Sequence, residues 1–221
     1  MPKHLQREIE SVTENLLALS ARVEEAVRDA VHSLVERDAP LAEDVMAKDD
    51  AIDEMEVAIE EQCLKVLALH QPVAVDLRLL VAALKINNDL ERIGDLAVNI
   101  AERAQWLASQ PPAGSGFDFA AMAEKTQWML RNSLDAFVKV DPKRARKVCE
   151  ADDEVDAMNR QMYGLVESGV LEKPEAVSVL IHLLSVSRHL ERIADLATNI
   201  AEDVVYISEG EIIRHKLEHY G

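Results

Sequence analysis

An all-α protein made of two tandem three-helix bundles is predicted from three observations. The 13-residue stretch from Leu90 to Glu102 returns as Leu190 to Glu202 with only two differences. Proline-containing breaks recur in the same order in both halves. The composition, with 48% hydrophobic residues and only seven glycines and seven prolines, favours helices throughout. The chain is therefore expected to be an internal duplication of a helical unit.

Three helices are expected in the first half. Apolar residues spaced by three or four predict a long first helix. Asp38 is the expected N-cap of the second helix, with Pro40 among its early residues, because a side-chain oxygen before a helix satisfies free amide groups. Gln71-Pro72 separates the second helix from the third, which carries the repeated stretch. The expected helices cover about residues 3–37, 39–70 and 72–108.

The second half is expected to repeat this plan. The stretch at residues 109–118 is the only one rich in Pro, Gly and Ser, and it predicts a linker between two units, 1–108 and 119–221. Asp141-Pro142 and Lys173-Pro174 match the two breaks of the first half. Helices are expected over about 119–140 and 142–170, followed by a last long helix after Pro174.

Each copy of the repeated stretch places acidic side chains on one face of its helix, opposite an apolar stripe. Glu91 and Asp95 are one turn apart, as are Glu191 and Asp195, so each pair can point at the same object. A solvated helix face is the simplest interpretation of one such row. However, the two halves differ over most of their length and had no packing reason to keep the same acids. Paired carboxylates also repel each other unless a cation lies between them. The acidic faces are therefore expected to bind something.

The middle helix of each half carries a second pair of acids at the same spacing. If helices two and three fold back at residue 71, the two pairs of the first half stand level to within about 3 Å. Four level carboxylates favour a hard or borderline cation: magnesium, manganese or iron, with zinc or nickel less preferred and a multinuclear cluster possible. The expected metal ligands are Asp49, Asp53, Glu91 and Asp95 in one site and Asp152, Asp156, Glu191 and Asp195 in the other.

The net charge of −17 argues against nucleic acid or an anionic membrane surface as a direct partner, since both require clustered Lys and Arg. The sequence shows no signal-peptide pattern and no run of eighteen apolar residues, so a cytoplasmic protein is expected. Cys63 and Cys149 occupy unrelated positions in the two halves, and both are expected to be small core residues without a disulfide.

This combination of motifs resembles the PhoU family of phosphate-signalling proteins. The resemblance is carried by the duplicated L-E-R-I-[GA]-D-L-A-x-N-I-A-E, the D-x-x-[IV]-D of each middle helix, Q-P-V-A-V-D-L-R from Gln71, and the closing E-D-V-V-Y-I-S-E-G-E-I-I-R-H-K. It implies two three-helix bundles, metal ions or clusters on the acidic faces, and a homodimer. It also implies an accessory of the Pst phosphate transporter that restrains the phosphate-starvation response through a sensor histidine kinase and its response regulator.

Two other functions compete with this one. A carboxylate-bridged di-metal oxidase of the ferritin-like class is also a helical bundle, but it requires inward-facing Glu-x-x-His pairs, and His182 and His189 fall outside the acidic rows. A metal-free adaptor would use its acidic faces only to bind basic partners. The sequence shows no catalytic constellation, and a protein that is not an enzyme is expected.

Overall fold

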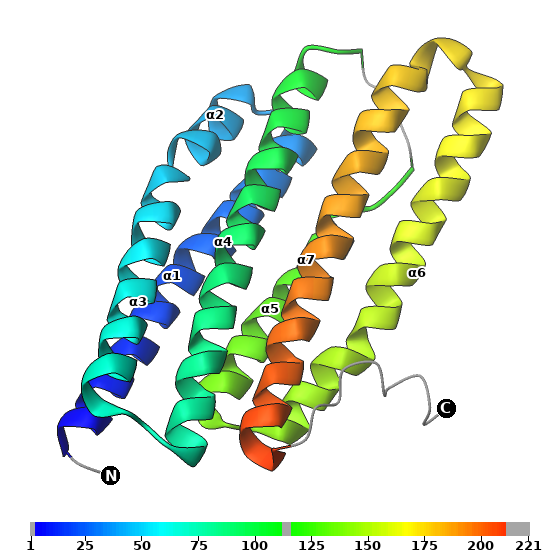
Figure 1. Cartoon of the computed structure of the whole chain (residues 1–221). Helices are drawn as coiled ribbons and strands as arrows, with labels where there is room; N and C mark the ends of the chain where they lie inside the picture. The colour runs from blue at the N-terminus through cyan, green and yellow to red at the C-terminus, as the bar shows by residue number, and fades with distance from the viewer. Residues whose placement is uncertain (1–2, 112–115, 211–221) are drawn as a thin grey trace.

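The computed structural model describes residues 3–111 and 116–210, and every regular element within these ranges is a helix (Figure 1). The predicted all-α fold, two tandem three-helix bundles related by duplication, is confirmed. Parts of the expected linker (112–115) and of the closing segment (211–221) lie outside the described residues. The elements are α1 (Lys3–Glu36), α2 (Ala39–Ala47), α3 (Asp50–His70), α4 (Ala74–Ala108), α5 (Phe119–Lys139), α6 (Pro142–Glu172), a 3₁₀ turn (Pro174–Ala176) and α7 (Val177–Glu209).

The first turn of each half is built in the same way. Arg37 and Val140 both adopt a left-handed backbone conformation directly after the first helix of their half. The Asp38 carboxylate then accepts a hydrogen bond from the Leu41 amide at 3.0 Å, which confirms the expected N-cap. Asp141 caps α6 through the amide groups of residues 143 and 144.

The middle helix differs between the halves. The single helix expected over residues 39–70 is wrong, because the chain forms a tight turn at Lys48 and Asp49 and divides into α2 and α3. The Lys48 amide donates to the Val45 carbonyl, a step of three residues instead of four, which ends α2. This turn lets α2 pack on both α1 and α4. In the second half, α6 runs unbroken from Pro142 to Glu172.

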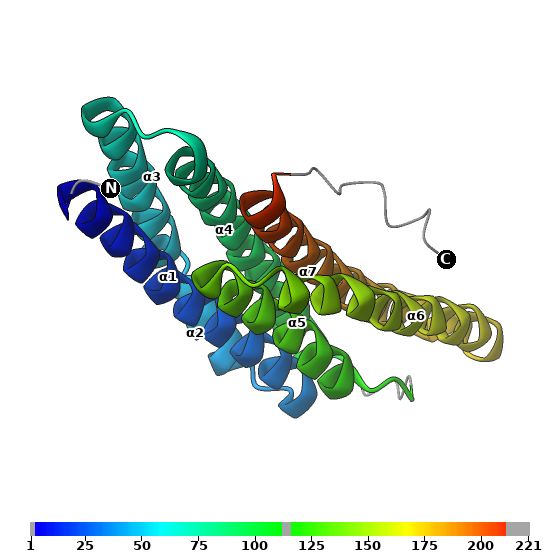
Figure 2. The same cartoon turned by 90° about the horizontal axis from the view of Figure 1, so that it is seen from below.

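The six long helices form two layers. Figures 1 and 2 show α3, α4, α7 and α6 side by side in one layer, with α1 and α5 in the other. Apolar side chains fill the space between the layers and form one continuous core through both halves. Its largest fully buried members include Leu16 and Leu19 of α1, Ile93 of α4 and Leu190 of α7.

The central pair, α4 and α7, runs antiparallel and joins the two halves. At one end of this seam, Lys85 Nζ lies 2.9 Å from Asp203 Oδ1, and the Asp203 side chain is buried. At the other end, the rings of Trp106 and His182 stack with centroids 3.9 Å apart. Each contact joins residues that are equally far along the chain from Gly94 on α4 and from Ala194 on α7. Gly94 and Ala194 therefore lie opposite each other.

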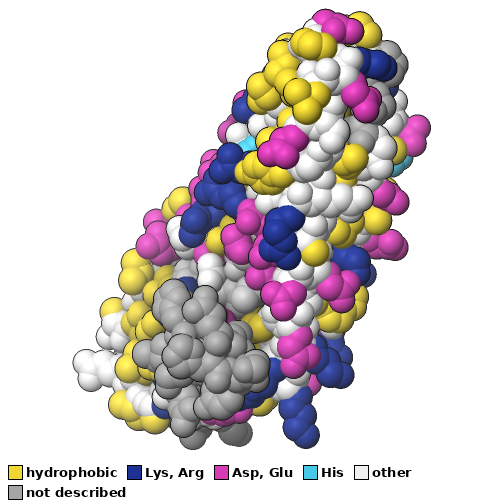
Figure 3. Space-filling view, turned by 90° about the vertical axis from the view of Figure 1, so that its right-hand side faces the viewer, with side chains coloured by type: hydrophobic (Ala, Val, Ile, Leu, Met, Phe, Trp, Pro, Cys, Tyr) yellow, Lys and Arg dark blue, Asp and Glu magenta, His cyan; other side chains and the backbone are white. Residues whose placement is uncertain are grey.

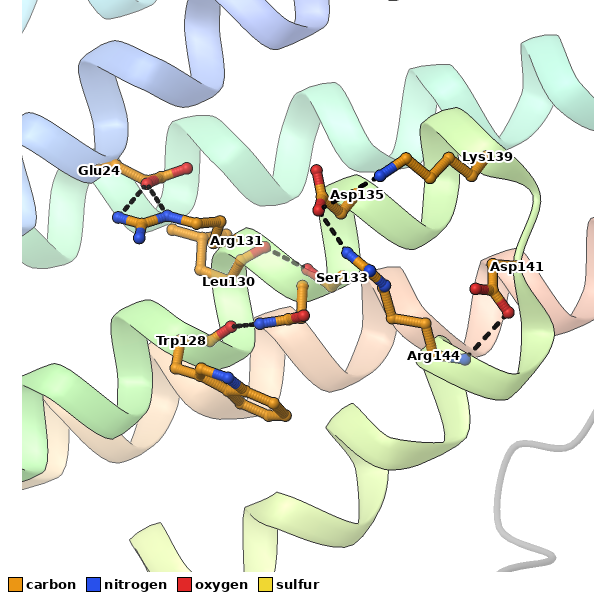
Figure 4. A network of polar contacts seen from close by, with 10 residues as sticks. Glu24, Trp128, Leu130, Arg131, Ser133, Asp135, Lys139, Asp141 and Arg144 are labelled. Carbon is orange, nitrogen blue, oxygen red and sulfur yellow. Dashed lines mark hydrogen bonds and ion pairs between the residues drawn. The ribbon is translucent and has the colours of Figure 1, made fainter.

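The second layer also joins the halves through a polar contact. The Arg131 guanidinium of α5 donates to Glu24 of α1 at 3.1 Å (Figure 4). On the same helix, the Asp135 carboxylate pairs with both Lys139 and Arg144, and so ties the end of α5 to the start of α6. These contacts fix α5 against α1 and α6.

Candidate metal centres

The first acidic cluster lies between the start of α3 and the middle of α4. Burial, followed by the charges of Asp53 and Asp95, raises the pKa of Asp49 to about 6. Burial also raises the pKa of Glu91, and the charges of Asp95, Asp53 and Asp49 add to this. Each carboxylate is thus within electrostatic reach of the other helix, as the fold-back at residue 71 predicts. The structure brings together all four acids expected in this half.

The second cluster lies between α6 and α7 and is more enclosed. Burial raises the pKa of Asp152 to about 7, with further contributions from Asp195, Asp156 and Glu191. The pKa values of Glu191 and Asp195 are raised as well, mainly by burial and next by neighbouring carboxylates. Asp152 Oδ1 is buried and has no hydrogen-bond partner among the described protein atoms. The four expected acids of this half are also neighbours.

Gly94 allows α3 to approach α4 closely at the first cluster. A Cβ atom at this position would lie 3.2 Å from Ile52 Cγ2 and 3.5 Å from Asp49 Oδ1. Its counterpart Ala194 is fully buried in the second half. The sequence marks this difference between the copies, but only the packing shows that the glycine lies directly against a candidate ligand.

Different polar side chains brace the two clusters one turn further along. In the first half, the Asn87 amide donates to the carbonyl and the carboxylate of Glu56, at 2.8 and 3.1 Å. In the second half, the Ser187 hydroxyl donates to Asn159 Oδ1 at 2.6 Å. Sequence reasoning did not identify these bridges. The replacement of Glu56 by Asn159 removes one negative charge beside the second cluster.

Other polar side chains of the repeated stretch lie beside the acidic clusters. Asn99 donates its amide to the Asp95 carbonyl at 2.7 Å and so caps its own helix turn. Arg192 opposes the raised pKa values of Glu191 and Asp195 through its positive charge. Arg92 lies 3.6 Å from Asp89. Among the described residues, neither Arg92 nor Arg192 forms an ion pair with any of the eight acids, whereas Arg160 of α6 lies 3.4 Å from the Asp156 carboxylate.

Within the described residues, the histidines and cysteines do not join the clusters as a ligand set. His182 stacks on Trp106, and burial lowers the pKa of His189 to about 4. Cys63 is buried and Cys149 is half-buried, and neither forms a disulfide in the described part of the chain. Both cysteines have raised thiol pKa values, mainly through burial, as expected for packed thiols.

The donor set fits a cation, although the carboxylates do not converge tightly on a single point. Within residues 3–111 and 116–210, no three His, Cys, Asp or Glu side chains already form a group that could hold a metal ion. Like charges keep adjacent carboxylates apart, and a cation between them would reverse that repulsion. The unpartnered Asp152 oxygen is the clearest structural sign that a ligand fits here, because buried carboxylate oxygens are normally bonded.

The fold and the clusters define a duplicated helical protein with two carboxylate-rich sites. A family model described as the PhoU domain matches residues 16–104 and again 119–204, once in each half. The chain belongs to the PhoU family. It is 42% identical over 212 residues to the phosphate-specific transport system accessory protein PhoU homolog of Aquifex aeolicus, covering 96% of each chain.

Solved structures agree with the sequence comparison. The crystal structure of PhoU from Pseudomonas aeruginosa superposes with a TM-score of 0.89 at 38% identity, covering 93% of this chain and 99% of that one. The phosphate transport system regulatory protein PhoU from Streptococcus pneumoniae gives a TM-score of 0.84 at 29% identity, covering 94% and 98%. Both relatives therefore share the fold over more than nine-tenths of this chain.

Proposed function

We propose that this chain is a cytoplasmic, metal-binding regulator of phosphate uptake and phosphate-starvation signalling. The observation that carries the proposal is the pair of four-carboxylate clusters at equivalent places in the two halves. Partial burial and mutual repulsion raise carboxyl pKa values in both clusters. Such sites release free energy when a cation replaces protons and separates the charges.

The residues that would hold the ions are the eight acids, four in each half. Their donor atoms are all oxygens, so they suit magnesium, manganese or iron better than zinc or nickel. A bound cation would cross-link the middle and third helices of each bundle and stabilise the folded chain by mass action. The ions therefore act here as structural and regulatory ligands.

The regulatory part of the proposal is supported by the relatives and by the surface. The relatives are named as accessory or regulatory proteins of phosphate transport systems. None of the described helices is long and apolar enough to cross a membrane. We infer that the chain acts through protein partners: a phosphate ABC transporter, a sensor histidine kinase with its response regulator, and a second copy of itself.

We infer that such partners contact the two ends of the molecule, where apolar side chains are exposed. Val73 at the α3–α4 turn is 74% exposed, and Leu171 at the α6–α7 turn is 84% exposed. Figure 3 shows hydrophobic side chains gathered at the upper end of the face that carries α6. Exposed apolar groups of this kind occur at protein–protein contacts.

Metal content measured by mass spectrometry tests the first part of the proposal. Asp95→Ala with Asp195→Ala is expected to lower the number of ions retained per chain after dialysis. Asp50→Ala with Asp153→Ala is the matched control. It also removes one acid from each half, on α3 and α6, but neither acid is an expected metal ligand. Equal metal content in all three proteins would contradict the assignment of these ligands, and no retained metal in any of them would favour the metal-free adaptor.

Deletion of the gene in the source cell tests the regulatory part. An alkaline phosphatase or reporter assay in abundant phosphate is expected to show a derepressed starvation response. Reintroduction of the wild-type chain should restore repression, whereas the Asp95→Ala, Asp195→Ala chain should restore it less. A response that stays fully repressed after deletion would contradict the regulatory role.

A further inference from the structure

A polar cleft lies between α4 and α7, midway between the two acidic clusters. Its volume is about 290 Å³, and each helix contributes an arginine, an aspartate, a leucine and an asparagine. These are positions 92, 95, 96 and 99 and their counterparts one hundred residues later. The repeated stretch therefore builds one shared cleft in addition to its two separate acidic faces.

The antiparallel register explains why equivalent residues meet there. Lys85 contacts Asp203, and these residues lie nine positions before Gly94 and nine positions after Ala194. The stacked Trp106 lies twelve positions after Gly94, and its partner His182 lies twelve positions before Ala194. A local twofold axis thus passes between Gly94 and Ala194, and it relates the two walls of the cleft.

Two guanidinium groups approach the cleft from opposite walls. Arg92 and Arg192 are exposed, and neither makes a short ion pair across the cleft in the described structure. An arginine presents a planar fork of N–H donors that matches the oxygens of phosphate-like anions. Two such forks related by a twofold axis suit an anion that offers oxygens in several directions.

The charges of the two aspartates in the lining affect how strongly an anion can bind in the cleft. Asp95 and Asp195 line the cleft and also belong to the two clusters, so their charges oppose an anion in the absence of metal. A cation in each cluster would neutralise them and leave the arginines as the uncompensated charges. Metal in the clusters is therefore expected to strengthen anion binding in this cleft.

We propose that this cleft binds inorganic phosphate between Arg92 and Arg192 when both acidic clusters hold metal. The inference rests on the metal binding proposed above and adds a ligand to it. The buried side chains of Leu96 and Leu196 lie in the cleft lining. The cleft volume lies just below the range of pockets for drug-sized molecules, roughly 300–1,000 Å³, and so suits a small ion.

Equilibrium dialysis of radiolabelled phosphate against the full, manganese-loaded chain tests this site. Phosphate is expected to bind the loaded chain and to be lost after chelation. Arg92→Gln with Arg192→Gln should weaken binding about 100-fold, since each charge-assisted contact contributes roughly tenfold. Arg28→Gln with Arg103→Gln removes two positive charges outside the cleft, and should leave binding unchanged.

Metal content measured in the same samples separates this inference from the proposed function. A loaded chain that retains its metal but binds no phosphate, or binds it equally well in the Arg92→Gln, Arg192→Gln variant, would overturn the phosphate site alone. If that variant loses metal or fails to fold, Arg92→Lys with Arg192→Lys replaces it, because lysine keeps the charge and loses the fork. Binding by the lysine pair as tight as wild type would also count against the site.

A phosphoryl group carried by a partner protein has the same chemistry as free phosphate. A phosphoserine peptide is therefore included as a competitor. Weak competition by the peptide agrees with a site for the free ion. A peptide that binds at the arginines while inorganic phosphate does not would overturn the proposal for the free ion.

Discussion

In the first half, Asp49 stands at the turn between α2 and α3, whereas in the second half Asp152 stands within the unbroken helix α6. The pKa of Asp49 rises to about 6 and that of Asp152 to about 7, because Asp152 is more enclosed. The same D-x-x-[IV]-D motif therefore produces two environments. The comparison indicates that the second cluster gains more from a bound cation, since more unfavourable carboxylate charge is relieved there.

Metal loading is expected to produce the largest effect on stability. At a free metal concentration about 1,000 times Kd, one site occupied only in the folded chain adds about 4 kcal/mol to the free energy of unfolding. Asp152→Asn should remove more of this gain than Asp49→Asn. Urea denaturation with manganese and with a chelator measures both losses, and the adjacent Asp153→Asn and Asp50→Asn are the controls. Equal losses at Asp49 and Asp152 would remove the proposed ranking of the two sites.

The ends of the α4–α7 seam should also respond differently. Lys85→Met removes the ion pair between Lys85 and the buried Asp203 carboxylate, and is expected to lower the free energy of unfolding by about 2 kcal/mol. Ser185→Ala, at the equivalent position of α7, should change it by less than about 0.5 kcal/mol. Chemical denaturation of both variants checks this, and similar losses would show that the seam is symmetric in energy.

Exchange of the small residues at the centre of the repeats gives a smaller effect. Ala194→Gly is expected to lower the free energy of unfolding by about 1–2 kcal/mol, through helix propensity and a lost buried methyl group. Gly94→Ala gains helix propensity but places a methyl group 3.2 Å from Ile52 Cγ2, so its net change should stay below about 1 kcal/mol. Urea midpoints compare the two, and a large gain from Gly94→Ala would show that α3 moves aside freely.

The pH dependence of the metal-free chain should show the smallest difference. A carboxyl group whose folded-state pKa is raised contributes stability below its unfolded-state value and loses it as the pH rises through the folded-state value. For Asp152 that loss extends to about pH 7, and for Asp49 to about pH 6. Between about pH 6.5 and 8, Asp152→Asn should therefore flatten the decline in stability more than Asp49→Asn. Urea denaturation in chelator at pH 6.5 and pH 8 measures this. Equal changes in the free energy of unfolding for the two variants would contradict the proposed difference between Asp152 and Asp49.

Much of the fold follows from local signals in the sequence. Asp38 and Asp141 cap helices because an aspartate precedes a proline-containing first turn at each position. The turn at Lys48 has no such signal, since it contains neither Gly nor Pro and depends on how α2 packs on α1 and α4. A break caused by tertiary packing leaves no local mark on the sequence.

The acidic clusters were predictable because helical spacing and the distance from the turn at residue 71 already place Asp53 near Glu91. The environment of each acid was not predictable in this way. The contact of Gly94 with Asp49 and the unpartnered oxygen of Asp152 depend on interhelical distances. The cleft between Arg92 and Arg192 requires the antiparallel register of α4 and α7, which periodicity within one helix does not contain.

Anomalous X-ray scattering from crystals grown with manganese tests the metal-binding claim most directly. We expect anomalous peaks at both clusters, with carboxylate oxygens from the middle and third helices about 2.0–2.2 Å from each ion, as for small oxygen-ligated cations. We also expect the higher occupancy beside Asp152 when manganese is limiting. A crystal grown in excess manganese with no anomalous peak at either cluster, or with peaks only at unrelated surface acids, would contradict the claim.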